Sequence, residues 1–226
     1  MKIPLSERLL ACCGFVRPGD RVADVGCDHG YLGIHLLKNG IASFVIAADI
    51  NEGPLQSAYR NAYKFGVRDK MTFHLSDGVR NIPQDFDVLV CAGMGADTIM
   101  SILTSASWLQ NEQYRLILQC QSKTPTLRRY LSDNGWHIAE ETVLKDGKFL
   151  YTIMEVQFQP HQPRLTLGQC HLSPALLAHP TQWLPDYFKW VTEGLRIATA
   201  HQNDPEKAQA LAELEALAHL FKEDLT

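Results

Sequence analysis

The chain has 226 residues, of which 46% are hydrophobic and 20% charged, and its formal net charge is −4. This length and composition are those of a globular protein with one large domain, or one domain and an appendage, and they exclude a disordered chain. The negative net charge argues against a general nucleic-acid-binding protein, whose surface is basic overall.

The first elements of the chain are a short helix over 5–14 and an apolar strand over 22–25. Gly26 and Gly30 then predict a tight turn, followed at once by a helix over 30–39. Glycine allows positive φ and close approach to a ligand, and the N–H groups of a helix start attract negative charge. A glycine-containing turn between strand and helix is where nucleotide-like cofactors bind in open α/β sheets, although such a turn also occurs for packing alone.

Strand and helix patterns alternate up to residue 159. Apolar runs predict strands over 44–49, 71–75, 86–91 and 114–119, and helical spacing predicts helices over 52–65, around 99–103 and over 123–134. Two last strand patterns, around 137–144 and 149–158, are joined by Asp146-Gly147, a dipeptide typical of hairpins. Alternating units of this kind form a parallel sheet covered on both faces. The sequence therefore predicts an α/β fold of five parallel βα units with a terminal β-hairpin.

The last part of the chain has helical patterns only. Pro160 and Pro163 mark a linker, and apolar stripes predict one helix over 181–203 and a second that starts at Pro205. These two helices form a coiled-coil-like αα-hairpin. We therefore expect a first domain over 1–159 and a helical C-terminal domain over 160–226. Two helices are too thin to bury both faces, so the hairpin is expected to dock on the sheet domain, a partner or a second copy.

Polar residues follow several predicted strands and meet at one edge of the sheet. Four such stretches are Asp24–Gly30, Asp49, Asp77-Gly78 and Ala92–Gly95. The carboxylate of Asp24, just before the turn, repels a pyrophosphate but suits a cationic amino-acid group. Asp49 suits the two hydroxyls of a ribose, unless it only caps the next helix, and Asp77 can accept from an adenine amino group. This set favours S-adenosylmethionine over a dinucleotide.

Five stretches carry a resemblance to a known family. They are Asp-Val-Gly-Cys-Asp-His-Gly-Tyr-Leu (24–32), Ala-Asp-Ile-Asn-Glu-Gly-Pro (48–54), Ser-Asp-Gly (76–78), Ala-Gly-Met-Gly-Ala (92–96) and Leu-Ile-Leu-Gln (116–119). They resemble the bacterial tRNA (adenine-22 N1)-methyltransferases, and the similarity covers nearly the whole chain. Cys27 and Ala96 depart from the family pattern, but both are small. The resemblance implies a Rossmann-like class I methyltransferase sheet with a C-terminal helical appendage.

The resemblance also implies where S-adenosylmethionine binds. The implied positions are Asp24, Gly26, Gly30, Asp49, Asp77 and Gly78, with the backbone of Ala92 and Gly93 beside the sulfur. We add three residues of the same stretches to the cofactor site: Cys27, Ile50 and Met94. Met94 is either a lid over the cofactor or part of the core.

The substrate atom is expected to be a ring nitrogen. Enzymes that methylate exocyclic adenine amines carry an (Asp/Asn)-Pro-Pro-aromatic motif after the fourth strand, where this chain has Ala-Gly-Met-Gly. Adenine N1 attacks without losing a proton first, so positioning matters more than a strong base. We expect Asp28 to stabilise the developing charge, and His29 and Tyr31 to contact the unpaired or flipped-out base. The alternatives are a local helix-start role for His29 and a core role for Tyr31.

The expected partner is tRNA, but the residues that bind it are weakly indicated. Modest basic clusters are Lys64, Arg68 and Lys70; Lys123, Arg128 and Arg129; Lys145 and Lys148; and Arg8, Arg17 and Arg21. Each cluster either contacts phosphates or is simply solvated.

The sequence is also compatible with functions other than tRNA methylation. A non-catalytic RNA-binding or regulatory protein that kept the fold is the main alternative, ahead of a small-molecule methyltransferase and an NAD(P)-dependent oxidoreductase. The six cysteines show no zinc-like spacing, so no metal is expected. Residues 1–16 lack a signal-peptide pattern and no apolar run could span a bilayer, which favours a cytoplasmic protein. The sequence does not decide between a monomer and a weak dimer.

Overall fold

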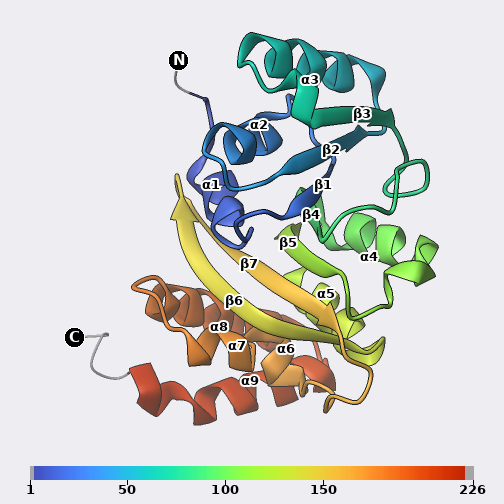
Figure 1. The fold of residues 1–226 in the computed structure, drawn as a ribbon. Helices are drawn as coiled ribbons and strands as arrows, with labels where there is room; N and C mark the ends of the chain where they lie inside the picture. Colours follow the sequence, from blue (N-terminus) through green and yellow to red (C-terminus); the bar gives the residue numbers. More distant parts are fainter. Residues whose placement is uncertain (1–2, 222–226) are drawn as a thin grey trace.

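A seven-stranded sheet forms the centre of the protein in a computed structural model that describes residues 3–221 (Figure 1). The strand order is β3-β2-β1-β4-β5-β7-β6. The strands are β1 Arg21–Val25, β2 Phe44–Asp49, β3 Met71–Leu75, β4 Val88–Gly95, β5 Arg115–Ser122, β6 Trp136–Asp146 and β7 Phe149–Phe158. The first five pair in parallel, and β7 is antiparallel to both of its neighbours. The predicted α/β fold with a terminal hairpin is confirmed.

Helices cover both faces of this sheet. The helices are α1 Glu7–Gly14, α2 Tyr31–Lys38, α3 Glu52–Lys64, α4 Ala96–Ser105, α5 Thr124–Asp133, α6 Leu167–His171, α7 Pro174–Ala178, α8 Leu184–His201 and α9 Pro205–Ala216, with short 3₁₀ turns at Arg68–Lys70, Ser107–Leu109 and Ala218–Phe221. One buried apolar cluster joins α1, α2 and α3 to the sheet, and another joins α4 and α5 to the opposite face. This is the layering expected for βα units.

The connection between β3 and β4 differs from the sequence prediction. Residues 76–87, all of which the structure describes, contain no helix, so the third strand is not followed by the expected helical unit. Val79, Ile82 and Phe86 of this loop are buried in the same cluster as α4. The loop therefore packs its apolar side chains without helical periodicity, and Pro83 works against a helix there.

The strand β4 is also longer than predicted, since it continues to Gly95. Beyond Cys91 it still pairs with β5, with register shifts between Ala92 and Met94 and between Met94 and Gly95. The stretch expected to be a loop is therefore an irregular strand end. Residues 92–95 thus form the carboxyl end of β4, at the edge where the polar strand ends are expected to meet.

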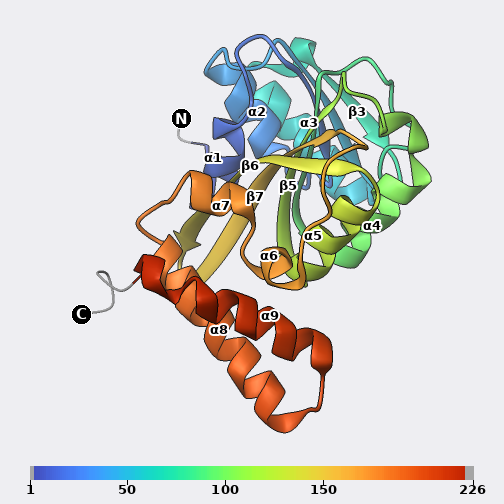
Figure 2. The ribbon, with the colours of Figure 1, turned by 90° about the horizontal axis from the view of Figure 1, so that it is seen from below.

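The C-terminal helices dock on the β-hairpin. Val143 of β6 is buried in an apolar cluster with residues of α7, α8 and α9, and Leu150 of β7 packs against it. Seen from below, α8 and α9 lie side by side and extend away from the sheet (Figure 2). The short helices α6 and α7 were not predicted. The apolar stripe of the helix predicted over 181–203 contains either Trp190 or Val191, and it is Val191 that packs against this cluster, whereas Trp190 is 64% exposed.

One member of a basic cluster has a different role from the one considered. Arg128 has no exposed surface and pairs with Glu141 of β6, with 2.7 Å between Nη2 and Oε1. It therefore cannot contact a phosphate, and the expectation that it could is wrong. Its charge is satisfied inside the protein, where sequence spacing gives no sign of the partner.

Two further features of the described residues bear on function. No helix between residues 3 and 221 is both long and apolar enough to cross a membrane. All six cysteines are buried and free of disulfides.

Candidate functional site

A cavity of about 390 Å³ lies at the carboxyl edge of the sheet, where the polar strand ends were expected to meet. It is lined by Val25, Gly26, Asp49, Ile50, Ser76, Asp77, Gly78, Arg80, Met94, Asp97, Thr98, Ser101, Ile102 and Ser105. Six of the predicted cofactor residues are in this set: Gly26, Asp49, Ile50, Asp77, Gly78 and Met94. Ligands of open α/β sheets bind at this edge.

The turn between β1 and α2 requires its glycines. Gly26 has φ of +72°, and a Cβ there would overlap with Cε of Met94. Gly30 has φ of +71°, and its Cβ would lie 2.9 Å from that of Ala58. Asp28 adopts φ of +48° without being a glycine. The turn is therefore held in a conformation that brings backbone close to the cavity wall.

Asp49 connects this turn to the end of β2. One carboxylate oxygen accepts from the backbone N–H of Asp28 at 3.1 Å, and the other from that of Asn51 at 2.9 Å. The second bond supports the start of α3, so Asp49 also has the structural role that was its alternative, at the start of the next helix. Each oxygen can accept more than one hydrogen bond. Asp49 lines the cavity and keeps acceptor capacity for a ligand hydroxyl.

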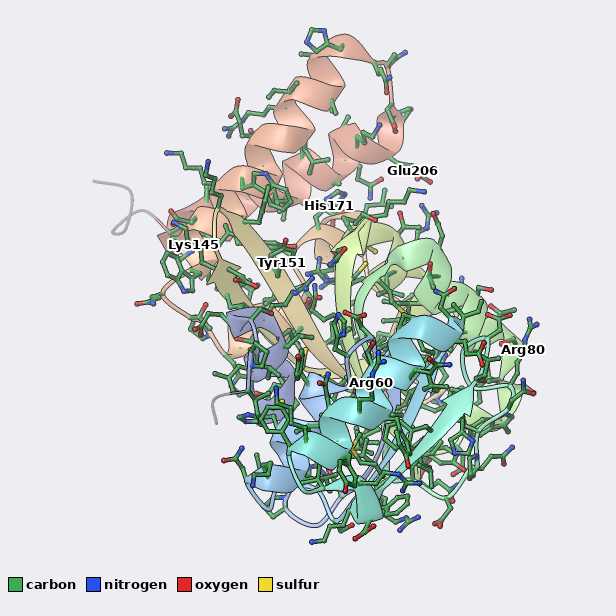
Figure 3. The ribbon with its side chains drawn as sticks, turned by 90° about the horizontal axis from the view of Figure 1, so that it is seen from above. Arg60, Arg80, Lys145, Tyr151, His171 and Glu206 are labelled. Carbon is green, nitrogen blue, oxygen red and sulfur yellow. The ribbon has the colours of Figure 1, made fainter. Side chains whose placement is uncertain are left out.

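Asp77 forms an ion pair with Arg80, a basic residue outside the clusters predicted from the sequence. Its Oδ2 lies 3.1 Å from Nη1 of Arg80, and both side chains are 57% exposed. Arg80 also lines the cavity, at the position labelled in Figure 3. The spacing of three residues is the only sequence sign of this pair. The pair places one negative and one positive charge together at the cavity rim.

Asp24 is buried beneath the turn and does not line the cavity. It is 4% exposed, and its Oδ2 has no hydrogen-bond partner within the described part of the chain. Burial raises the pKa of its carboxyl from 3.8 to about 7. A buried carboxylate oxygen without a partner favours a nearby cation.

The end of β4 is fixed by a buried glutamine. Gly93 has φ of +79°, and its N–H donates to Oε1 of Gln119 at 3.0 Å. The Nε2 of Gln119 donates in turn to the carbonyl of Cys120 at 2.9 Å, and the side chain has no exposed surface. From the sequence alone, Gln119 is only the last residue of the Leu-Ile-Leu-Gln stretch (116–119). It sets the path of the Ala92–Gly93 backbone, as expected of a residue that supports a binding turn.

Arg8 of α1, for which the sequence indicates only a phosphate contact, is a candidate residue of this site. Its guanidinium lies 5.3 Å from the ring centroid of Tyr151, and a Cβ on Gly93 would be 3.9 Å from its Nη1. The Nε is buried without a hydrogen-bond partner, and none of the ion pairs found between residues 3 and 221 involves Arg8. Its position off the apolar stripe of α1 was the available signal. A cation without a counter-charge thus borders the Gly93 turn.

The predicted catalytic residues lie at the outer face of the first turn. His29 Nε2 is 3.7 Å from Oδ1 of Asp28, and both side chains are more than half exposed. The His29 ring also lies 5.8 Å from that of Tyr31, at an interplanar angle of 36°. None of the three lines the cavity. They form an accessible polar and aromatic group beside it.

The remaining predicted cofactor residues surround the cavity rather than line it. Cys27 and Gly30 are buried within the turn, and Ala92 and Gly93 are half-buried on the strand end. They shape the backbone that Gly26 and Met94 present to the cavity. The predicted cofactor residues therefore lie together, some in the wall of the cavity and the others in the backbone directly behind it.

Comparisons with known proteins agree with this architecture. A family model described as a methyltransferase domain matches residues 5–154. A Mycoplasma genitalium protein named "Putative tRNA methyltransferase MG248" is 33% identical over 159 residues, which are 69% of this chain and 70% of that protein. The tRNA (adenine(22)-N(1))-methyltransferase of Bacillus subtilis is 30% identical over 154 residues, 68% of this chain and 65% of that enzyme.

Solved structures extend the similarity to the C-terminal helices. The crystal structure of Streptococcus pneumoniae Sp1610, "a putative tRNA (m1A22) methyltransferase", has a TM-score of 0.83 at 28% identity and covers 96% of this chain and 99% of that one. The same protein in complex with S-adenosyl-L-methionine has a TM-score of 0.82 at 30% identity, covering 93% and 99% of the two chains. This chain therefore belongs to the methyltransferase-domain family, and its predicted kinship with the tRNA (adenine-22 N1)-methyltransferases is confirmed.

Proposed function

We propose that this protein transfers a methyl group from S-adenosylmethionine to N1 of adenine 22 in tRNA. The observation that carries the proposal is the acidic lining of the cavity, where Asp49 and Asp77 stand at neighbouring strand ends. A dinucleotide site has a glycine-rich cradle for phosphate at this place. The acidic set here fits a ligand that has no phosphate.

The residues present fit the parts of S-adenosylmethionine. Asp49 accepts from the ribose hydroxyls, and Asp77 accepts from the adenine amino group at the cavity rim. The unpartnered oxygen of Asp24 provides the negative charge that the ammonium group needs. Arg8, which has no counter-charge in the described chain, provides the positive charge for the carboxylate. The arrangement supplies one protein charge for each charge of the amino-acid moiety.

Bound S-adenosylmethionine supplies an electrophilic methyl group on a sulfonium, which the in-plane lone pair of adenine N1 attacks. The protein's task is to align the two groups and to exclude water. The Ala92–Gly93 backbone, held by Gln119, forms the wall at the reacting centre. Positive charge moves to the adenine during transfer, so the exposed carboxylate of Asp28 stabilises it there. His29 and Tyr31 contact the base.

The substrate also bears on location and organisation. A tRNA substrate places the reaction in the cytoplasm. We further propose that the described residues up to 159 form the cofactor-binding domain and residues 160–221 a helical domain, because helices α6–α9 share one apolar cluster. The ends of the two predicted domains, residues 1–2 and 222–226, lie outside the described residues. The N1 atom belongs to the Watson–Crick edge, so adenine 22 must be unpaired when it reacts.

A methylation assay tests the proposed function. Purified protein with labelled S-adenosylmethionine is expected to label unmodified bacterial tRNA, and not the same tRNA with guanine at position 22. Calorimetry is expected to show cofactor binding that Asp49→Ala weakens strongly. Asp69→Ala, on an exposed 3₁₀ turn, is the matched control and is expected to leave binding unchanged.

The outcomes separate the alternatives. Absence of cofactor binding would overturn the enzymatic function and favour a non-catalytic RNA-binding protein with this fold. Cofactor binding without labelling of tRNA would show that the cofactor is right and the substrate wrong.

A further inference from the structure

A second cavity, of about 360 Å³, lies between the ends of β5 and β7 and helix α8. Tyr151 and His171 both line it, and Figure 3 labels Tyr151 at the hairpin strands and His171 closer to the C-terminal helices. Its volume is in the range of small-ligand sites. It shares no lining residue with the first cavity.

The second cavity adjoins the proposed reaction site. Asp97 lines the first cavity and Lys123 the second, and their side chains form an ion pair at 2.7 Å. Gln121 also lines the second cavity, and its Nε2 would be 3.6 Å from a Cβ on Gly93. The ring of Tyr151 lies under the guanidinium of Arg8. A substrate at the Gly93 turn would therefore have this cavity as its neighbour.

The lining offers aromatic surface together with an unsatisfied polar group. Trp190 is 64% exposed, and its ring lies 5.8 Å from that of Tyr187. Thr152 is 3% exposed, and its Oγ1 has no hydrogen-bond partner within the described residues. A buried hydroxyl of this kind is destabilising unless a ligand or water bonds it. Burial lowers the pKa of His171 to about 4, so its ring is neutral near pH 7.

We propose that the second cavity binds an unstacked tRNA base that flanks the methylated adenine. This inference rests on the proposed function. Withdrawing one base from a stack leaves its neighbour with an uncovered face, and an exposed aromatic side chain can cover it. Trp190 provides that face, and the hydroxyl of Thr152 bonds the polar edge of the base. Lys123 and Lys207 at the rim lie near the phosphates.

Paired variants test the role of each group. Trp190→Ala is expected to raise KM for tRNA about tenfold, as expected for loss of one base–aromatic stack, and Trp190→Phe to restore most of it. Thr152→Val is expected to raise KM severalfold. Its matched control is Thr192→Val, because Thr192 is also buried with an unpartnered hydroxyl but does not line the cavity. Affinity for S-adenosylmethionine is expected to stay constant in all four variants.

A fluorescent base locates the contact. We would place 2-aminopurine at each of the two nucleotides that flank adenine 22. One position is expected to be quenched by the wild-type protein and not by Trp190→Ala.

The experiments distinguish failure of the proposed function from failure of the base-binding cavity. If wild-type protein does not methylate tRNA, the proposed function is wrong. If it does, but Trp190→Ala and Thr152→Val keep the wild-type KM and quenching, the base-binding cavity is wrong. A fall in kcat with unchanged quenching would instead assign the cavity to the methylated adenine and would also overturn this inference.

Discussion

The guanidinium of Arg128 donates to both carboxylate oxygens of Glu141, with 2.7 Å between Nη2 and Oε1, and neither side chain is exposed. Nη1 of Arg128 also donates to the carbonyls of Cys170 and His171, at 2.9 Å each. Ser173 donates its hydroxyl to Glu141. Arg128 is on α5 and Glu141 on β6, so the pair ties α5 to the sheet. The bonds to residues 170, 171 and 173 tie both side chains to the segment that begins the C-terminal helices.

Removing one partner of this pair is expected to be strongly destabilising. Arg128→Met leaves the charge of Glu141 buried without a counter-ion, which lowers the free energy of unfolding by about 3–5 kcal/mol. Urea denaturation measures this fall in the free energy of unfolding. The matched control is Arg129→Met, since the neighbouring Arg129 forms an exposed pair with Glu206 and its loss is expected to change little.

A double variant separates charge burial from packing. Arg128→Met with Glu141→Leu is expected to recover part of the lost stability, because no unpaired charge remains. If the double variant is no more stable than Arg128→Met, the buried charge is not the cause.

Gln119 is expected to support the reaction through the backbone it holds. Gln119→Leu leaves the N–H of Gly93 without its acceptor, which lowers the free energy of unfolding by about 1–3 kcal/mol. The Ala92–Gly93 wall then loses its fixed position, so the methyl-transfer rate is expected to fall more than the affinity for the cofactor. Single-turnover kinetics and calorimetry provide the two readouts.

An exposed glutamine gives the reference for this variant. Gln110→Leu is expected to leave stability and rate unchanged, because Gln110 is exposed beyond a 3₁₀ turn. Equal losses of rate and affinity in Gln119→Leu would argue against a specific role in alignment.

The sequence predicted the elements whose signal is local. The strand–turn–helix at Gly26 and Gly30 was found because glycine and apolar periodicity are properties of a short window. The hairpin at Asp146-Gly147 was found for the same reason. Helices α6 and α7 have five residues each, too few for a helical period to be visible.

The missed residues depend on contacts between distant parts of the chain. Arg128 has the pattern of a surface helix residue, and only the docking of β6 and α6 shows that it is buried. Arg8 lies on α1, yet its neighbours Gly93 and Tyr151 come from β4 and β7. Such sites arise from tertiary packing, so a single sequence without the fold does not specify them.

Arg8 is expected to recognise the carboxylate of S-adenosylmethionine. Arg8→Ala removes a charge-assisted contact of about 1.5–3 kcal/mol, so affinity is expected to fall about 10- to 100-fold. Calorimetry with a decarboxylated analogue makes the test specific. Wild-type protein is expected to bind the analogue more weakly than S-adenosylmethionine, and Arg8→Ala is expected to bind the two alike.

A second arginine with a similar environment provides the control. Arg68 also stacks on aromatic rings, those of Tyr59 and Phe73, and its Nε is likewise buried without a partner. Arg68→Ala is expected to keep the preference for S-adenosylmethionine. Continued discrimination by Arg8→Ala would place the carboxylate elsewhere.

Asp24 is expected to make stability depend on pH in the direction opposite to that of a paired carboxylate. Its carboxyl has a pKa of about 7 in the folded protein, because burial disfavours the charge, against 3.8 for the free group. Between these values the folded state binds more protons, so the contribution of Asp24 falls as pH rises from about 4 to about 7 and is constant above. Three units correspond to roughly 4 kcal/mol. Asp24→Asn is expected to be the more stable protein at pH 8, with the advantage lost near pH 4.

The same ionisation is expected to control binding of the cofactor. Only the ionised Asp24 pairs with the ammonium group, and with a pKa of about 7 the ionised fraction rises about tenfold from pH 6 to pH 8. Affinity for S-adenosylmethionine is therefore expected to rise about tenfold over this range in the wild-type protein. In Asp24→Asn, affinity is expected to be weak and to lack this rise. A rise of the same size in both proteins would assign the titration to another group and remove Asp24 from the site.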